Sequence, residues 1–154
     1  MNEESLGPLK TLTRNRLRLI WEMAQAGGVL SAADALTAQL MGEHPEWHQR
    51  WARADELSDA EFTTGDVNPA LHIVAHQIVW NQIDGALPAA REVYEALQAQ
   101  GLTAHEAIHR IGAVLMEEVY AVLKHQRPYD KATYVRKLQA LVKRAQPMRR
   151  RRRR

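Results

Sequence analysis

The chain has 154 residues, of which 45% are hydrophobic, and this length is enough for one domain with a buried core. No apolar run approaches the roughly 20 residues that span a bilayer, and the first residues lack the apolar core of a signal peptide, so a cytoplasmic location is expected. The absence of cysteine excludes disulfides, thiolate zinc sites and cysteine nucleophiles.

The positive charge of the chain is concentrated at its C-terminal end. The formal net charge is +3, but residues 143–154 hold eight basic residues and no acidic one. Removing those eight charges leaves −5 for residues 1–142. We therefore expect an acidic helical domain, residues 10–145, between a flexible N-terminal segment, residues 1–9, and an arginine-rich tail, residues 146–154. The like charges of the tail predict an extended, disordered conformation.

Helical periodicity and helix-start signals recur along the chain, and no segment shows the two-residue period of a strand. Helices are predicted over about residues 11–25, 31–41, 45–54, 69–84, 88–100, 104–125 and 130–143. Asn68 followed by Pro69, and the capping box of Thr103 and Glu106, are the clearest helix starts. Residues 55–67 are acidic and turn-rich, which predicts a loop with at most one helical turn. The predicted fold is all-α, a compact bundle of five to seven helices.

The same pattern predicts which helix faces are buried. Trp21 is expected in the core, and the arginines of the first helix are expected on a solvated face. In the helix at 69–84, Gln77 and Asn81 lie opposite the apolar stripe and are expected on the polar side.

Six of the seven histidines form three H-x-x-x-H pairs, and only His125 stands alone. Residues four apart share one face of a helix, and two of the pairs fall on or beside apolar stripes. Two imidazoles from each of two packed helices supply four neutral nitrogen donors, which suit Zn, Fe, Ni or Cu. The predicted metal ligands are His72, His76, His105 and His109, with His44 and His48 as a possible additional pair.

The histidines also have a structural interpretation, in which they lie in the core or at its edge and bond to backbone or carboxylate groups. Pro45 and Trp47 lie between His44 and His48 and favour such a packing role for that pair. A di-iron carboxylate site is not expected, because Glu117 lies away from the histidines. The motifs of dinucleotide binding, P-loops and serine hydrolases are absent. Residues 105–109, HEAIH, have the residue order of the zinc-protease motif H-E-x-x-H, but peptidase activity is not predicted and no catalytic residue is assigned.

Five stretches of the chain match one family pattern in order. They are HPEWH at 44–48, NPALHIVAH at 68–76, the segment 88–97, HEAIH at 105–109, and the segment 128–138. Together they resemble a family of small bacterial proteins catalogued as a domain of unknown function, number 1841, over about residues 30–141. The resemblance implies a shared helical fold and leaves the activity open. The family pattern has an acidic residue where this chain has Asn81, which disfavours a metal site that needs a carboxylate there.

Three functions follow from these features. The first is a metal-binding helical protein, with oxygen-handling or hydrolytic chemistry as its enzymatic forms. The second is a non-enzymatic module that docks a protein partner through an exposed face of Trp47 and Trp51. The third is a nucleic-acid accessory protein whose tail binds phosphates weakly and without sequence preference, because residues 143–154 hold no aromatic side chain to stack on bases.

Overall fold

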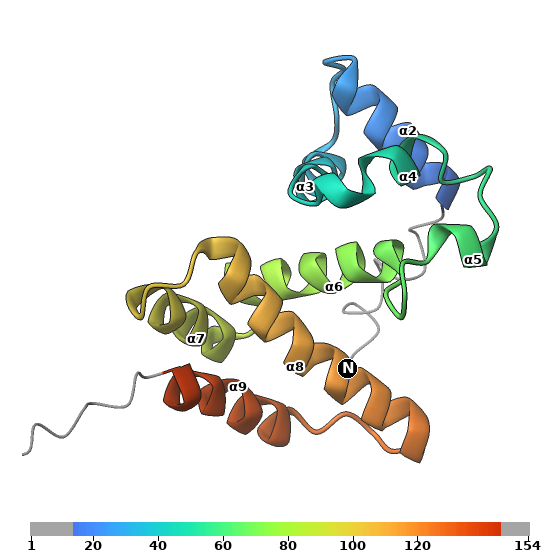
Figure 1. Ribbon diagram of the computed structural model, residues 1–154. Coiled ribbons are helices and arrows are strands. Elements are labelled where there is room, and N and C mark those ends of the chain that lie inside the picture. Colours follow the sequence, from blue (N-terminus) through green and yellow to red (C-terminus); the bar gives the residue numbers. More distant parts are fainter. Residues whose placement is uncertain (1–13, 146–154) are drawn as a thin grey trace, which may run out of the picture. The chain divides into compact units, whose positions relative to one another are not determined.

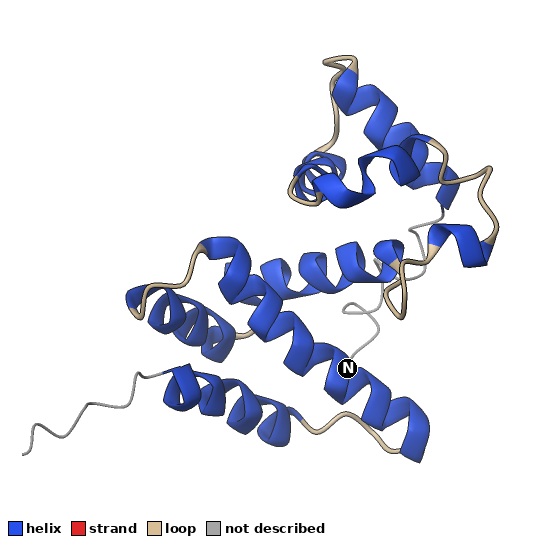
Figure 2. Cartoon of the chain, viewed as in Figure 1, coloured by secondary structure: helices blue, strands red, loops and turns tan. Residues whose placement is uncertain are grey.

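The computed structural model describes residues 14–145, and all regular elements within that range are helical (Figures 1 and 2). The α-helices are α2 (Arg14–Gln25), α3 (Ala32–Gly42), α4 (His48–Ala52), α5 (Asp59–Phe62), α6 (Pro69–Asn81), α7 (Pro88–Ala99), α8 (Ala104–His125) and α9 (Lys131–Ala145). Two further helical turns are η1 (Pro45–Trp47) and η2 (Gln82–Ala86). The all-α prediction is confirmed. The structure has one α-helix more than the five to seven expected. The additional helix is α5, a single turn in the acidic segment for which the sequence indicated at most one turn.

The described chain divides into two units between Ile78 and Val79. The first unit contains α2 to α5 and most of α6, and the second contains η2 and α7 to α9. Each unit is described by itself, and the single domain expected for residues 10–145 stays a prediction. The predicted flexible N-terminus and arginine-rich tail lie outside the described residues.

The first unit is built on α2, which packs against α3 and α4. Ser31 begins α3 by accepting a hydrogen bond at Oγ from the backbone N–H of Asp34 (3.2 Å). Trp21 is 8% exposed, so its predicted place in the core is confirmed. The core side chains of this unit are Leu17, Ile20, Trp21, Leu40, Met41, Trp47, Trp51, Phe62, Ile73, Val74 and Ile78.

The expected exposed tryptophan face is wrong. Trp51 is fully buried and Trp47 is 6% exposed. Trp51 meets the rings of Trp47 and Phe62 edge to face, each at 5.9 Å between centroids. Burying two indole rings together removes a large apolar area from water and stabilises the fold. The four-residue spacing showed only that the two rings share a helix face, and did not show whether that face is exposed. Trp47 and Trp51 therefore do not form the exposed face that the sequence predicted.

The arginines of α2 anchor the acidic segment at residues 55–67. Arg14 pairs with Asp59, and the Nε of Arg18 lies 2.9 Å from a carboxylate oxygen of Asp55. All four side chains are partly or fully exposed, so solvent screens both pairs and each contributes little to stability. The predicted solvated face of α2 is thus also an ion-paired face, to which Asp55 and Asp59 of the acidic segment bind.

Helix α6 begins as the sequence predicts and ends differently. The Oδ1 of Asn68 accepts a hydrogen bond from the backbone N–H of Ala70 (3.0 Å), which caps the helix. The predicted helix continued to residue 84, but the α-helical pattern stops at Asn81 and the chain continues as the π-helical turn η2. Gly85 closes this turn at a φ of 143°, a conformation that favours glycine.

A buried polar contact joins α3 and α6. Gln77 is 8% exposed and Thr37 is 1% exposed, so the prediction that Gln77 lies on the polar side is wrong. Its Nε2 donates to the Oγ1 of Thr37, and that hydroxyl donates to the carbonyl of Ala33 (3.0 Å). This hydrogen bond offsets part of the cost of burying the NH2 group of the amide.

In the second unit, α7, α8 and α9 pack on one another. The capping box predicted for α8 is present, with the Glu106 carboxylate accepting from the Thr103 N–H (2.8 Å) and the Thr103 hydroxyl accepting from the Glu106 N–H (3.2 Å). The core of this unit includes Val93, Leu97, Ile108, Ile111, Leu115, Tyr134 and Leu138. Within the described residues, no helix combines the length and apolarity needed to cross a bilayer.

Candidate metal centre

The loop between α3 and α4 positions His44. This residue precedes Pro45, which starts η1, and its backbone lies at φ −119° and ψ 72°. Proline disfavours the helical conformation in the residue before it, so His44 leaves the path of α3 and its side chain turns inward. The imidazole is only 2% exposed. The sequence prediction gave this histidine a secondary place, but the structure makes it a central member of the candidate site.

Helix α6 supplies two more histidines from one face. His72 and His76 are one turn apart, and their ring centroids are 4.4 Å apart. His76 is 2% exposed and His72 is half-buried. Both belong to the pair that the sequence predicted as ligands, and the expectation that this pair lies on the inward half of α6 is confirmed.

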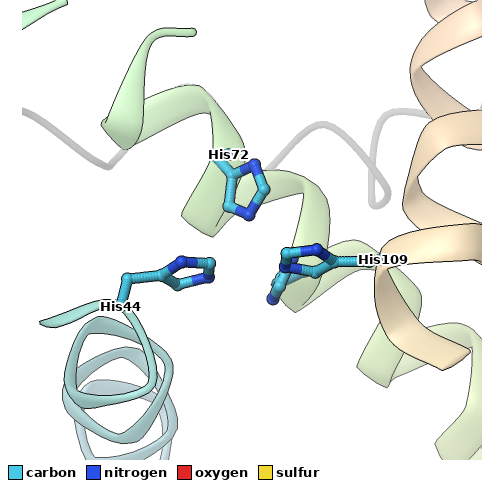
Figure 3. Close-up of side chains that lie close together, drawn as sticks. His44, His72 and His109 are labelled. Carbon is cyan, nitrogen blue, oxygen red and sulfur yellow. The ribbon is translucent and has the colours of Figure 1, made fainter. Parts of the chain in front are cut away.

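His44 faces the α6 pair. Its ring centroid lies 4.6 Å from that of His72, at an interplanar angle of 88°, and 5.3 Å from that of His76. Figure 3 shows the rings of His44 and His72 pointing toward one another from separate elements. We call His44, His72 and His76 the three-histidine cluster.

The ring nitrogens of the three-histidine cluster lie close enough for one ion. One nitrogen from each ring lies within 4.8 Å of one from each of the other two. Nitrogens bound to a tetrahedral ion at about 2.0–2.1 Å are about 3.3 Å apart. A shared coordination shell would therefore require the nitrogens to approach one another by up to about 1.5 Å.

Trp47 forms an apolar wall beside the cluster. Its ring stacks on His44 at 4.6 Å with an interplanar angle of 18°, and it meets His72 edge to face at 5.0 Å. Trp51 supports Trp47 from within the core. An apolar shell of this kind limits the access of water to a site and holds its side chains in place.

A carboxylate binds the outer edge of one imidazole. The Oε1 of Glu46 lies 2.9 Å from the Nδ1 of His44. Burial acts to raise the pKa of Glu46. Its hydrogen bonds with His44 and with its own backbone, together with the nearby charges of His44 and His72, lower the pKa by more, so the net change is downward. The contact therefore joins a partly exposed carboxylate to one edge of the buried His44 ring. The sequence prediction missed this residue, although a carboxylate two positions after a histidine in an H-P-E sequence is a signal for it.

His48 is not placed with its predicted partner. Its ring packs on Trp21 at 4.7 Å between centroids, and its Nε2 forms a hydrogen bond with the carbonyl of Gly42 (3.2 Å). The structure thus assigns the two histidines of this pair to different surroundings. The packing interpretation fits His48, whereas His44 joins the cluster.

The third pair lies on α8 in the second unit. The ring centroids of His105 and His109 are 4.2 Å apart, and both side chains are half-buried. This agrees with the prediction that the pair lies at the edge of a helical core. The remaining histidine, His125, is exposed at the end of α8.

The acidic side chains of α8 are engaged elsewhere. Glu118 is 1% exposed and its carboxylate lies 2.9 Å from a guanidinium nitrogen of Arg127. Glu117 pairs with Lys137 at 2.8 Å. These contacts are ion pairs within the second unit.

The fold and the three-histidine cluster define a small all-α protein with a buried group of imidazoles between helices. The chain belongs to the family described as a domain of unknown function (DUF1841), whose pattern matches residues 10–140. This confirms the resemblance found in the sequence. No curated protein and no solved structure shows significant similarity to the chain.

Proposed function

We propose that this protein binds one transition-metal ion through the imidazoles of His44, His72 and His76. The observation that supports the proposal best is the mutual approach of three ring nitrogens within 4.8 Å at a place where two of the rings are 2% exposed. The two histidines on α6 are sequence neighbours on one helix face, but His44 comes from a different element. Helix spacing alone does not explain why the imidazole of His44 approaches the two imidazoles on α6.

The chemistry of the donors indicates the class of ion. Neutral imidazole nitrogen suits Zn, Cu, Ni and Fe, whereas Mg and Ca prefer oxygen ligands. Three protein ligands leave a further coordination position for another ligand, as in catalytic zinc sites with three histidines. We use zinc as the probe ion, because it has no redox chemistry and accepts a tetrahedral geometry made of three imidazoles and one further ligand.

The test is metal content and affinity of the full-length chain without a purification tag. We expect one equivalent of Zn²⁺ to bind in calorimetric titration. We expect His76→Ala to remove stoichiometric binding, because it deletes one of the two buried imidazoles. Circular dichroism of the variant should keep most of the helical signal, since α6 holds its other buried contacts.

His125→Ala is the matched control. It removes an imidazole from an exposed position outside the cluster, so binding should equal that of the wild-type chain. The proposal is wrong if the wild-type chain takes up no zinc, nickel, copper or iron, or if His76→Ala binds as well as His125→Ala. In that case the histidines are structural, and His76→Ala should instead destabilise the fold by about 1–3 kcal/mol through a lost buried contact.

A further inference from the structure

We propose that Glu46 is a positioning residue, which holds His44 as the Nδ1–H tautomer so that Nε2 is the nitrogen presented to the ion. The inference rests on the proposed metal function and adds the group that prepares the ligand. Histidines that bind metals commonly donate their other ring N–H to a carboxylate, which fixes the ring and makes the binding nitrogen more basic.

The first step of the argument is the direction of the hydrogen bond. The two atoms concerned, Nδ1 of His44 and Oε1 of Glu46, are 2.9 Å apart. An ionised carboxylate has only acceptors, so the proton in this bond belongs to Nδ1. In a neutral imidazole the lone pair available to an ion is then on Nε2.

The second step is the position of that nitrogen. Nε2 of His44 is a buried atom, and the His44 ring points toward that of His72 (Figure 3). The edge of the ring that carries Nδ1 meets Glu46, whose side chain is 55% exposed. The carboxylate therefore sits on the solvent side of the imidazole, and the opposite edge is directed into the three-histidine cluster.

The third step is the restraint of the ring by its own segment. Pro45 fixes the start of η1, which places Glu46 and Trp47 in the turn directly after His44. Trp47 stacks on the face of the imidazole while Glu46 binds its edge. Four consecutive residues, HPEW, thus supply the ligand, the turn, the hydrogen-bond acceptor and the stacking ring.

An ordinary surface ion pair is the competing interpretation. In that interpretation the contact contributes about 0–1 kcal/mol to stability and does not influence metal binding. The two interpretations differ because a positioning residue changes metal affinity and tautomer, whereas a surface pair changes neither.

The affinity experiment compares Glu46→Ala, Glu46→Gln and Glu56→Ala in the full-length chain. Glu56 is the matched control, because it is an exposed carboxylate of the same unit that pairs with Arg53 at 3.1 Å. We expect Glu46→Ala to weaken Zn²⁺ binding about 10–100-fold. Glu46→Gln should recover part of this loss, because its amide oxygen can still accept from Nδ1–H but has no charge. Glu56→Ala should bind zinc as the wild-type chain does.

The tautomer experiment needs no metal. Long-range ¹H–¹⁵N spectra of the metal-free wild-type chain at neutral pH should show His44 in the Nδ1–H form, and Glu46→Ala should lose this preference. A wild-type His44 in the Nε2–H form overturns the inference, as does a Glu46→Ala affinity equal to that of Glu56→Ala. If the wild-type chain binds no metal, the proposed function fails, and the tautomer spectra alone then decide whether Glu46 orients His44.

Discussion

At the scale of single residues, the fold depends on polar side chains whose partners come from distant segments. Gln77 lies one position after a cluster histidine on α6 and is buried because Thr37 of α3 accepts its hydrogen bond. Its sequence position predicted a polar face, since helix periodicity does not include a partner from another helix. The contact therefore fixes α6 against α3 close to the three-histidine cluster.

Removing one partner of this contact should cost more than removing both. We expect Thr37→Val alone to destabilise the protein by about 1–3 kcal/mol, because it leaves the buried amide of Gln77 without its acceptor. The double variant Thr37→Val with Gln77→Leu should recover part of that loss, since no polar group is then left without its partner. Urea unfolding midpoints measure both values. A double variant whose loss equals the sum of the two single losses would show that the two side chains do not act together.

At the scale of elements, the helix starts are set by short local signals. Ser31, Ser58, Asn68, Thr103 and Asp130 each accept a backbone N–H in the first turn of the helix that follows. Such caps need only a few consecutive residues, which is why the predicted starts of α3, α6 and α8 agree with the structure. The end of α6 was less predictable, because the π-helical turn depends on how the chain must bend into α7.

The capping box of α8 should make stability depend on pH. Hydrogen bonds from the backbone N–H and the side chain of Thr103 lower the pKa of Glu106. Its folded-state pKa lies below its unfolded value, so its contribution is complete above about pH 4.3 and is lost as the pH falls through the folded-state pKa. We expect Glu106→Gln to be less stable than the wild-type chain at pH 7, with the difference shrinking below about pH 4.

Chemical denaturation at a series of pH values measures this effect. Glu95→Gln is the control, because Glu95 is an exposed carboxylate in the middle of α7 and caps no helix start. Glutamine can still accept the Thr103 N–H, so equal stability of Glu106→Gln and Glu95→Gln at every pH would contradict a contribution from the charge of Glu106.

At the scale of the whole molecule, the three-histidine cluster belongs to one of two units. All of its side chains come from the first unit, and Glu46, Trp47 and Trp51 surround it there. The prediction that His105 and His109 bind the same ion stays a sequence prediction, as does weak binding of phosphates by the arginine-rich tail, which lies outside the described residues.

Metal binding should stabilise the molecule unevenly. Zinc at 100 times its dissociation constant stabilises the native state by about 2.7 kcal/mol. If the three histidines suffice, amide exchange should slow most in peptides that cover residues 44–51 and 69–78. Exchange measured by mass spectrometry with and without Zn²⁺ tests this, with His76→Ala as the control that should show no change. Slower exchange in peptides of α8 would support the predicted role of His105 and His109, whereas protection absent from residues 44–51 would contradict a role for His44.

The sequence by itself determined the all-α class, the clearest helix starts, the family, and the pairing of His72 with His76. Each of these depends on residues a few positions apart, on helix spacing or on an ordered set of short motifs. The tertiary structure decided which pair member joins the cluster, with His44 turned toward α6 and His48 against Trp21. It also decided the burial of Trp47 and Trp51 and the role of Glu46. These contacts depend on which segments, distant in the sequence, pack together when apolar area is buried. A local sequence pattern does not specify those distant partners.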